Sequence, residues 1–180
     1  MKKILAAVLM TAVAAVNVLA FDWYAGTSLN FHTLSGDDAE GSYFAIAPEI
    51  GYIFSDKIDA GVGFGYESDD KYNATSVKTD TWSVIPFVRY KAFAAGSFAF
   101  YARLQLSYGS SKVDGEDESI DTFGVAALPV VEYAISDRFT LWTSFGALSY
   151  TTVSSGDNSV SDFGLDLDMN ALTFGFAVNF

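Results

Sequence analysis

The chain has 180 residues, of which 51% are hydrophobic and 16% aromatic, and its formal net charge at pH 7 is −12. This composition excludes a disordered chain, and the negative charge argues against nucleic acid as a partner because phosphates would be repelled. Cysteine is absent, which excludes disulfides and a lipid-anchored amino terminus.

The amino terminus has the pattern of a secretory signal peptide. Lys2 and Lys3 precede an uncharged stretch from Ile4 to Ala20 that ends in small residues, which predicts cleavage after Ala20. A retained membrane helix is the alternative, because the stretch is about long enough to span a bilayer. The predicted organisation is a signal peptide over 1–20 and a single domain over 21–180. Without its two lysines, 8 of the 10 basic side chains remain against 22 acidic ones, a net charge of −14.

After residue 21 no apolar run is long enough for a membrane helix, so any crossing must use closed strands. A proline followed four residues later by tyrosine starts at Pro48, Pro86 and Pro129, at intervals of about 40 residues. Four such hairpin units fill the domain and predict eight antiparallel strands. Their expected ranges are 22–33, 42–54, 58–67, 80–92, 97–109, 120–135, 139–151 and 166–180.

Alternation along these segments separates two rows of side chains, because successive strand residues point to opposite faces. In 58–67, Ile58, Val62 and Phe64 lie on one row, and Asp59 and three glycines lie on the other. A membrane barrel turns its bulky row toward lipid and keeps the inner row small or polar. The predicted fold is therefore an all-β, eight-stranded, up-and-down transmembrane barrel.

Two features fit this pattern less well. In 139–151, Trp142 and Leu148 fall on the row that the other residues assign to the interior. The three strand prolines cannot donate a ladder hydrogen bond, so we expect local bulges or water-reachable sites beside them. The tyrosine of each repeat, namely Tyr52, Tyr90 or Tyr133, would then lie at the periplasmic membrane interface, where aromatic residues gather.

The connections alternate in length. Those at 55–57, about 93–96 and 136–138 are short, whereas those at 34–41, 68–79, 110–119 and 152–165 are long and polar. In bacterial outer-membrane barrels short turns face the periplasm and long loops face outward. This alternation places both termini on the periplasmic side.

The predicted barrel interior is the first candidate site. Inward parity selects Glu49, Arg89, Arg103 and Glu132, with Asp59 and Tyr101 also on that row. Buried charges of both signs must pair, and an eight-stranded barrel is only just wide enough for its own side chains. We expect a lumen plugged by this charge network, with a narrow ion or small-solute channel as the alternative.

The outer loops are the second candidate, since they hold most of the acidic residues, among them Asp69, Asp70 and Asp114. Such loops are candidates for divalent cations. The run Asp114-Gly-Glu-Asp-Glu118 lacks the ligand order of an EF-hand, so we predict no specific metal site and no cofactor. His32, the only histidine, points inward near the outer rim and leaves a lipid A-modifying enzyme as a distant alternative.

The segment Leu172–Phe180 alternates bulky apolar with small or polar residues and ends on an aromatic ring. Together with the signal peptide, the eight strands and the long loops, it resembles the small outer-membrane barrel family that includes OmpX, Ail and the transmembrane domain of OmpA. The resemblance implies that Phe174, Phe176 and Phe180 are read by the barrel assembly machinery, and that lipopolysaccharide and other outer-membrane lipids surround the barrel in a Gram-negative cell envelope.

The expected function is therefore a non-enzymatic, porin-like outer-membrane protein that supports the envelope or presents its loops to a partner. A soluble β-barrel carrier is the structural competitor, and in that case the apolar row would line a cavity instead of facing lipid.

Overall fold

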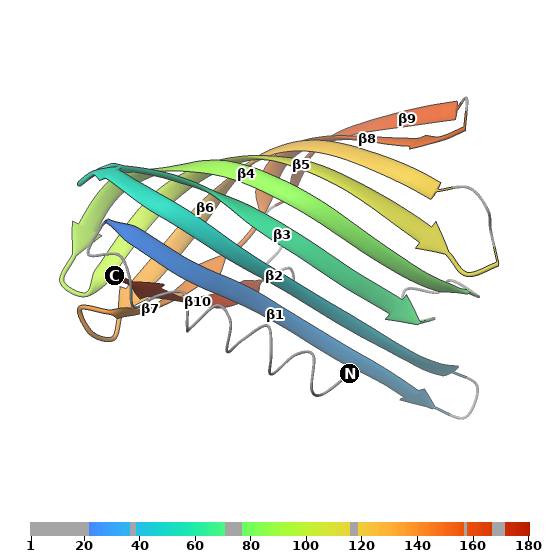
Figure 1. The fold of residues 1–180 in the computed structure, drawn as a ribbon, viewed down its shortest axis with the longest axis horizontal. Coiled ribbons are helices and arrows are strands. Elements are labelled where there is room, and N and C mark those ends of the chain that lie inside the picture. The colour runs from blue at the N-terminus through green and yellow to red at the C-terminus, as the bar shows by residue number, and fades with distance from the viewer. Residues whose placement is uncertain (1–21, 37–38, 71–76, 116–118, 157, 167–171) are drawn as a thin grey trace.

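The computed structural model describes residues 22–36, 39–70, 77–115, 119–156, 158–166 and 172–180, and these ranges form an all-β molecule. The predicted signal peptide at residues 1–20 lies outside them. No helix in the described ranges is long and apolar enough to span a membrane. The strands are β1 (Trp23–Gly36), β2 (Ala39–Ser55), β3 (Ile58–Asp70), β4 (Lys78–Ala95), β5 (Phe98–Val113), β6 (Ser119–Ala134), β7 (Phe139–Ser144), β8 (Ala147–Ser155), β9 (Asn158–Asp166) and β10 (Thr173–Asn179) (Figure 1).

The strands close into an eight-stranded antiparallel barrel, as predicted. Each of β1 to β6 pairs with the next strand along the chain, β6 pairs with β7, and β7 pairs with β10. Closure comes from β10 against β1, in a register that runs from Tyr24↔Asn179 to Ser28↔Gly175. Strands β8 and β9 form a hairpin that continues the wall beyond β7 and pairs with the outer part of β6.

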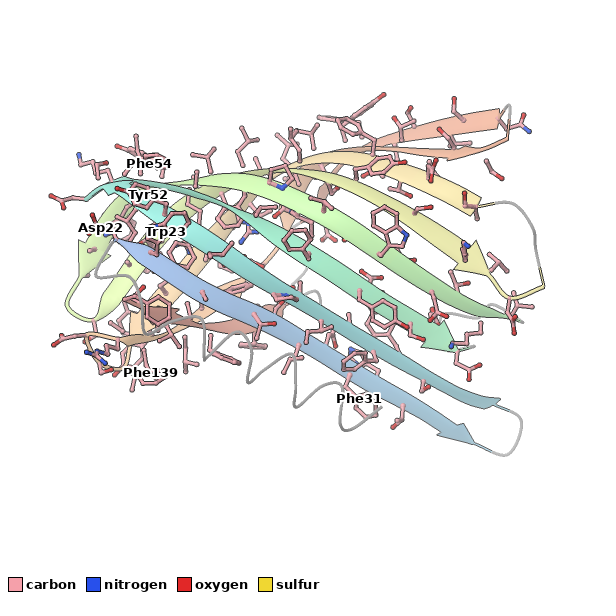
Figure 2. The ribbon with its side chains drawn as sticks, in the orientation of Figure 1. Asp22, Trp23, Phe31, Tyr52, Phe54 and Phe139 are labelled. Carbon is pink, nitrogen blue, oxygen red and sulfur yellow. The ribbon has the colours of Figure 1, made fainter. Side chains whose placement is uncertain are left out.

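The polarity of the barrel is inverted relative to a soluble protein. The buried hydrophobic residues of the described ranges are Tyr24, Phe87, Val130, Trp142 and Ala177, whereas large apolar side chains such as Phe64 and Phe174 are more than half exposed. Figure 2 shows this outward row, with labelled Phe54 and Phe139 pointing away from the wall. The exposed apolar band is the surface that a transmembrane barrel offers to lipid, and it excludes the carrier alternative.

The seventh predicted strand is broken, and the break explains its irregular parity. Between the pairs Val130↔Ser144 and Ala127↔Leu148, β6 advances three residues while its partner advances four. One extra residue inverts the inward and outward faces. Trp142 is therefore buried at 7% exposure while Leu148 is 45% exposed. Gly146, with φ of 64°, lies at this break.

The loop predicted at 152–165 is wrong. Most of that range continues β8 or forms β9, which pair from Ala147↔Asp166 to Ser155↔Asn158. The eighth predicted strand, 166–180, is accordingly wrong as a single piece, since the structure has the end of β9 and all of β10 there. The serine- and aspartate-rich composition of this stretch favours a loop locally, but pairing with β8 supplies the hydrogen bonds that local composition does not indicate.

The proline bulges are only partly as predicted. The ladder is interrupted without a register shift between β2 and β3 near Pro48, and likewise between β4 and β5 near Pro86. Near Pro129, β6 itself has no extra residue. The extra residue is in its partner segment, in the break between β7 and β8. Bulges instead occur at Ile53/Ser55 and Lys91/Phe93, beside the short turns.

The barrel has a turn end and a loop end. At the turn end, Ser55 and Ser136 each accept backbone hydrogen bonds from the residues two and three positions later, which explains why the two turn sequences are nearly the same. Asp22, Trp23, Tyr52, Phe54 and Phe139 gather at this end (Figure 2). The carboxy terminus lies there too, and Phe180 donates its backbone N–H to the carbonyl of Trp23 at 3.0 Å (Figure 1).

Candidate functional site in the barrel lumen

The inner row of side chains fills the turn-end half of the lumen. Arg89 on β4 is the centre of one cluster: its Nε donates to Asp59 Oδ1 at 2.7 Å, and its Nη1 donates to Glu132 Oε1. Tyr24 donates its hydroxyl hydrogen to the same Asp59 oxygen at 2.9 Å. One guanidinium therefore joins carboxylates from β3 and β6 across the lumen.

Aromatic rings enclose the Arg89 guanidinium. Its central carbon lies 4.7 Å from the ring centroids of both Tyr24 and Tyr101, within the range of a cation–π contact. Arg89 and Asp59 are only 5% and 4% exposed. Two charges buried this deeply need their full set of partners, because an unpaired buried ion carries a large desolvation cost.

A second ion pair lies beside the first. Arg103 on β5 donates from Nη1 to Glu49 Oε2 on β2 at 2.8 Å, and its guanidinium lies 3.8 Å from the Phe87 ring centroid. Two neighbouring polar atoms, Glu49 Oε1 and Arg103 Nε, are buried without a hydrogen-bond partner among the described residues. This pair is therefore incompletely satisfied, in contrast to the cluster around Arg89.

Inward glycines make room for the large rings that complete the plug. A side-chain carbon at Gly51 would overlap the Tyr24 ring, one at Gly61 would overlap Phe87, and one at Gly175 would overlap Trp142. Glycine has no Cβ, so each ring can lie flat over the neighbouring strand. Three aromatic residues and two neighbouring ion-paired groups thus lie in the lumen.

The plug leaves a cavity at the turn end of the lumen. Its volume is ≈ 190 Å³, and Asp59, Arg89 and Glu132 line it together with Lys57 and Lys91 near the turns. Toward the loop end, the inward residues Asn30 and His32 are exposed. The inward residues are therefore more exposed near the loops than in the turn-end half of the lumen.

All four residues of the predicted charge network lie in this plug. The sequence alone did not pair them, and the structure joins Arg89 to Glu132 and Arg103 to Glu49. The sequence pattern places Asp59 on the inner row but outside the predicted charge network. In the structure Asp59 is the second carboxylate partner of Arg89. Its position directly opposite Arg89 in the register of β3 and β4 could have been found from the hairpin alone.

The other predicted residues lie away from the lumen. Tyr52, Tyr90 and Tyr133 are on the outer surface near the turn end, where the Tyr52 ring lies 5.1 Å from Trp23 and the Tyr133 ring lies 4.9 Å from Phe98. Phe174 and Phe176 point outward from β10 and are 62% and 39% exposed, and Phe180 is half-buried.

The second candidate region, the acidic loops, lies partly outside the described residues, including Asp37, Asp38, Glu116 and Asp117. Within the described ranges, no group of three or more histidine, aspartate or glutamate side chains could hold a metal ion. His32 is exposed at the loop end, with its ring 6.0 Å from that of Tyr43.

Comparison with known proteins agrees with this architecture. Residues 4–180 match the model of the outer membrane protein beta-barrel domain. Among solved structures, Neisserial surface protein A is similar with a TM-score of 0.55 at 18% identity, covering 88% of this chain and 95% of that one. No curated protein matches the sequence significantly.

Two further solved structures are similar at lower scores. A major outer membrane protein from Thermus thermophilus has a TM-score of 0.47 at 14% identity, covering 90% of this chain and 100% of its own. The Yersinia pestis outer membrane protein Ail has a TM-score of 0.41 at 13% identity, covering 88% and 99%.

Proposed function

Because this chain belongs to the outer membrane protein beta-barrel domain family, and is therefore an outer-membrane barrel, we propose that it is a non-enzymatic protein with a plugged lumen. Its role is to support the envelope or to present its loops to a partner. The observation that carries this proposal is the presence of two neighbouring ion-paired groups around Arg89 and Arg103. They pack with Tyr24, Phe87 and Trp142 in the turn-end half of the lumen.

The orientation follows from the two unequal ends. Short turns and both ends of the barrel domain face the periplasm, and the longer connections face outward. The segment offered to the barrel assembly machinery has the exposed Phe174 and Phe176 of β10, followed by the half-buried Phe180. Outer-membrane lipids, including lipopolysaccharide, are the surrounding partners, and divalent cations at the acidic loops are a further proposed partner.

Conductance in a planar lipid bilayer tests the plug. The wild-type barrel gives no steady unitary current. The double variant Glu49→Ser/Arg103→Ser removes one complete ion pair without leaving a buried charge unpaired, and it gives resolved current steps. A steady, well-resolved unitary current through the wild-type protein would refute the plug.

A narrow channel is the second candidate function. The buried, unpartnered atoms Glu49 Oε1 and Arg103 Nε favour it, as does the turn-end cavity of ≈ 190 Å³, because polar groups of this kind line ion paths. The two functions give opposite results with the wild-type protein in the same bilayer experiment.

A further inference from the structure

The cavity at the turn end of the lumen has a mouth and an inner end that differ in charge. It lies at the end of the barrel with the short turns, where the carboxy terminus is also found (Figure 1). Its exposed lining residues Ser55, Asp56 and Lys57 mark the mouth, and the buried Asp59 and Arg89 mark the inner end. The volume of ≈ 190 Å³ is far larger than the about 10–15 Å³ that one water molecule needs. We call this space the turn-end cavity, and it is large enough for a small organic molecule.

Two lysines lie side by side at the mouth. The backbone N–H of Lys91 donates to the carbonyl of Lys57 at 2.7 Å, and the Lys91 ammonium lies 5.5 Å from the ring centroid of Tyr101. Neither lysine has an ion pair among the described residues, whereas Lys78 is bound to Asp80 at 3.2 Å. The mouth therefore holds two positive charges that no carboxylate binds directly.

Two hydroxyl groups of the lining each have a hydrogen left to donate. Ser55 Oγ accepts the backbone N–H groups of Lys57 at 3.3 Å and of Ile58 at 3.1 Å, and Thr140 Oγ1 accepts the side-chain N–H of Asn179 at 3.4 Å. A hydroxyl group has one donor hydrogen in addition to its acceptor lone pairs, and in the described part of the chain neither hydroxyl donates to an acceptor in the cavity. Together with the two ammonium groups, these donors suit a carboxylate.

The inner end of the cavity has the opposite charge. Arg89 is bound to both Asp59 and Glu132, so this group has two negative charges and one positive charge. Asp59 and Arg89 are only 4% and 5% exposed, and an uncompensated charge at such depth is costly. The inner end therefore has an excess of one negative charge and favours a cation.

The balance of charge along the cavity determines the kind of ligand that fits. Asp56 is the acidic lining residue at the mouth, so the two lysines and this aspartate leave an excess of one positive charge there. One carboxylate matches the mouth and one ammonium group matches the inner end. A simple anion would be repelled by the inner end, and a simple cation would be repelled by the mouth.

We propose that the turn-end cavity binds a small zwitterion, namely an amino acid or a dipeptide. The carboxylate of the ligand lies at Lys57 and Lys91, and its ammonium group points toward Asp59 and Glu132. The inference goes beyond the proposed function, because binding at one end of the barrel requires neither passage through the lumen nor a partner at the loops.

Three ligands of matched shape test the charge pattern. Glycylglycine carries both charges, N-acetylglycine lacks the ammonium group, and glycine N-methylamide lacks the carboxylate. The barrel is held in micelles of uncharged octyl glucoside, and NMR follows the backbone amide signals of Asp59 and Thr140, which line the cavity. Glycylglycine shifts these signals with a millimolar Kd. Each of the other two ligands binds at least about tenfold more weakly, because each has lost one charged contact.

A pair of double variants tests the mouth. Lys57→Met/Lys91→Met weakens the binding of glycylglycine by about tenfold or more, since the carboxylate loses both ammonium partners. Lys112→Met/Arg138→Met is the matched control, because it removes two exposed cations that do not line the cavity. The control keeps the wild-type Kd.

Glu132→Gln tests the inner end. It removes the excess negative charge and leaves Arg89 bound to Asp59, so N-acetylglycine binds this variant as tightly as glycylglycine does. A loss of structure would instead weaken both ligands equally and keep their ratio.

Three results would overturn the proposal. The first is equal binding of N-acetylglycine and glycylglycine to the wild-type barrel. The second is a wild-type Kd for glycylglycine in Lys57→Met/Lys91→Met. The third is the absence of any shift at Asp59 and Thr140 when glycylglycine is added far above millimolar concentration.

Discussion

At the scale of single residues, the plug depends on the match between large inward rings and inward glycines. Trp142 packs over Gly175 and Tyr24 packs over Gly51, each pair on adjacent strands. The small residue is as important as the large one, because an added methyl group has no space beside a backbone that is fixed in a ladder.

Gly175→Ala tests this match. Its new methyl group would lie against the Trp142 ring and 2.7 Å from the carbonyl oxygen of Thr27, so we expect a loss of about 1–3 kcal/mol in the free energy of unfolding. Urea titration in vesicles measures it. Gly63→Ala is the control, because its methyl group would find its nearest neighbours at 3.7 Å; equal losses at both positions would contradict the packing argument.

The buried ion pairs make a second prediction at this scale. Arg103→Met keeps most of the side-chain volume but leaves Glu49 buried without its partner, which we expect to cost about 3–5 kcal/mol of stability. The double variant Glu49→Gln/Arg103→Met recovers most of that loss, because no charge remains. At the exposed bridge to Asp80, Lys78→Met changes stability by about 1 kcal/mol or less. A loss as small for Arg103→Met as for Lys78→Met would show that the lumen pair is well hydrated.

At the scale of elements, the break between β7 and β8 reverses the faces of the wall. It allows Trp142 to enter the lumen while Leu148 faces lipid, although both have even numbers. It also separates the part of β6 that pairs with β7 from the part that pairs with β8. A single inserted residue thus reverses the inward and outward faces between β7 and the β8–β9 hairpin at the loop end.

Gly146→Ala tests the break. The backbone there has φ of 64°, where an L side chain costs roughly 1–2 kcal/mol. We expect a loss of that size in urea unfolding. Gly164→Ala on β9 is the control, since its nearest contact would be at 3.7 Å and its backbone has no positive φ; if the two variants lose the same amount, the strained break is not a feature of the folded barrel.

At the scale of the whole molecule, the two ends differ in structure and charge. The turn end has tight turns and aromatic residues next to them, and the loop end has strands that end in polar residues. This difference is the basis of the proposed orientation.

Labelling of single cysteines measures the orientation directly, because the native chain has none. In intact cells, Ser155→Cys at the loop end reacts with a membrane-impermeant maleimide, whereas Ser136→Cys at the turn end reacts only after the outer membrane is permeabilised. Both positions are exposed, so a difference reports the side of the membrane. The reverse pattern would invert the proposed orientation.

Alternation by itself determined much of this protein. The spacing of charged and glycine residues between apolar ones predicted the presence and order of β1 to β6, the outward apolar surface and the inner position of Glu49, Arg89, Arg103 and Glu132. The predicted ranges were too short at the loop end, where β1, β2 and β5 extend into segments predicted as loops. This information is local, because the period of two is a property of each strand and does not depend on its neighbour.

Only the tertiary structure decided the rest. The break at Gly146 and the strand β9 depend on how neighbouring strands pair, and the contact of Arg89 with Glu132 joins β4 to β6, which are not neighbours in the wall. One residue of slip inverts every face without changing the alternation within a strand. Register is fixed when the barrel closes and its lumen fills, and no single segment of the sequence carries that information.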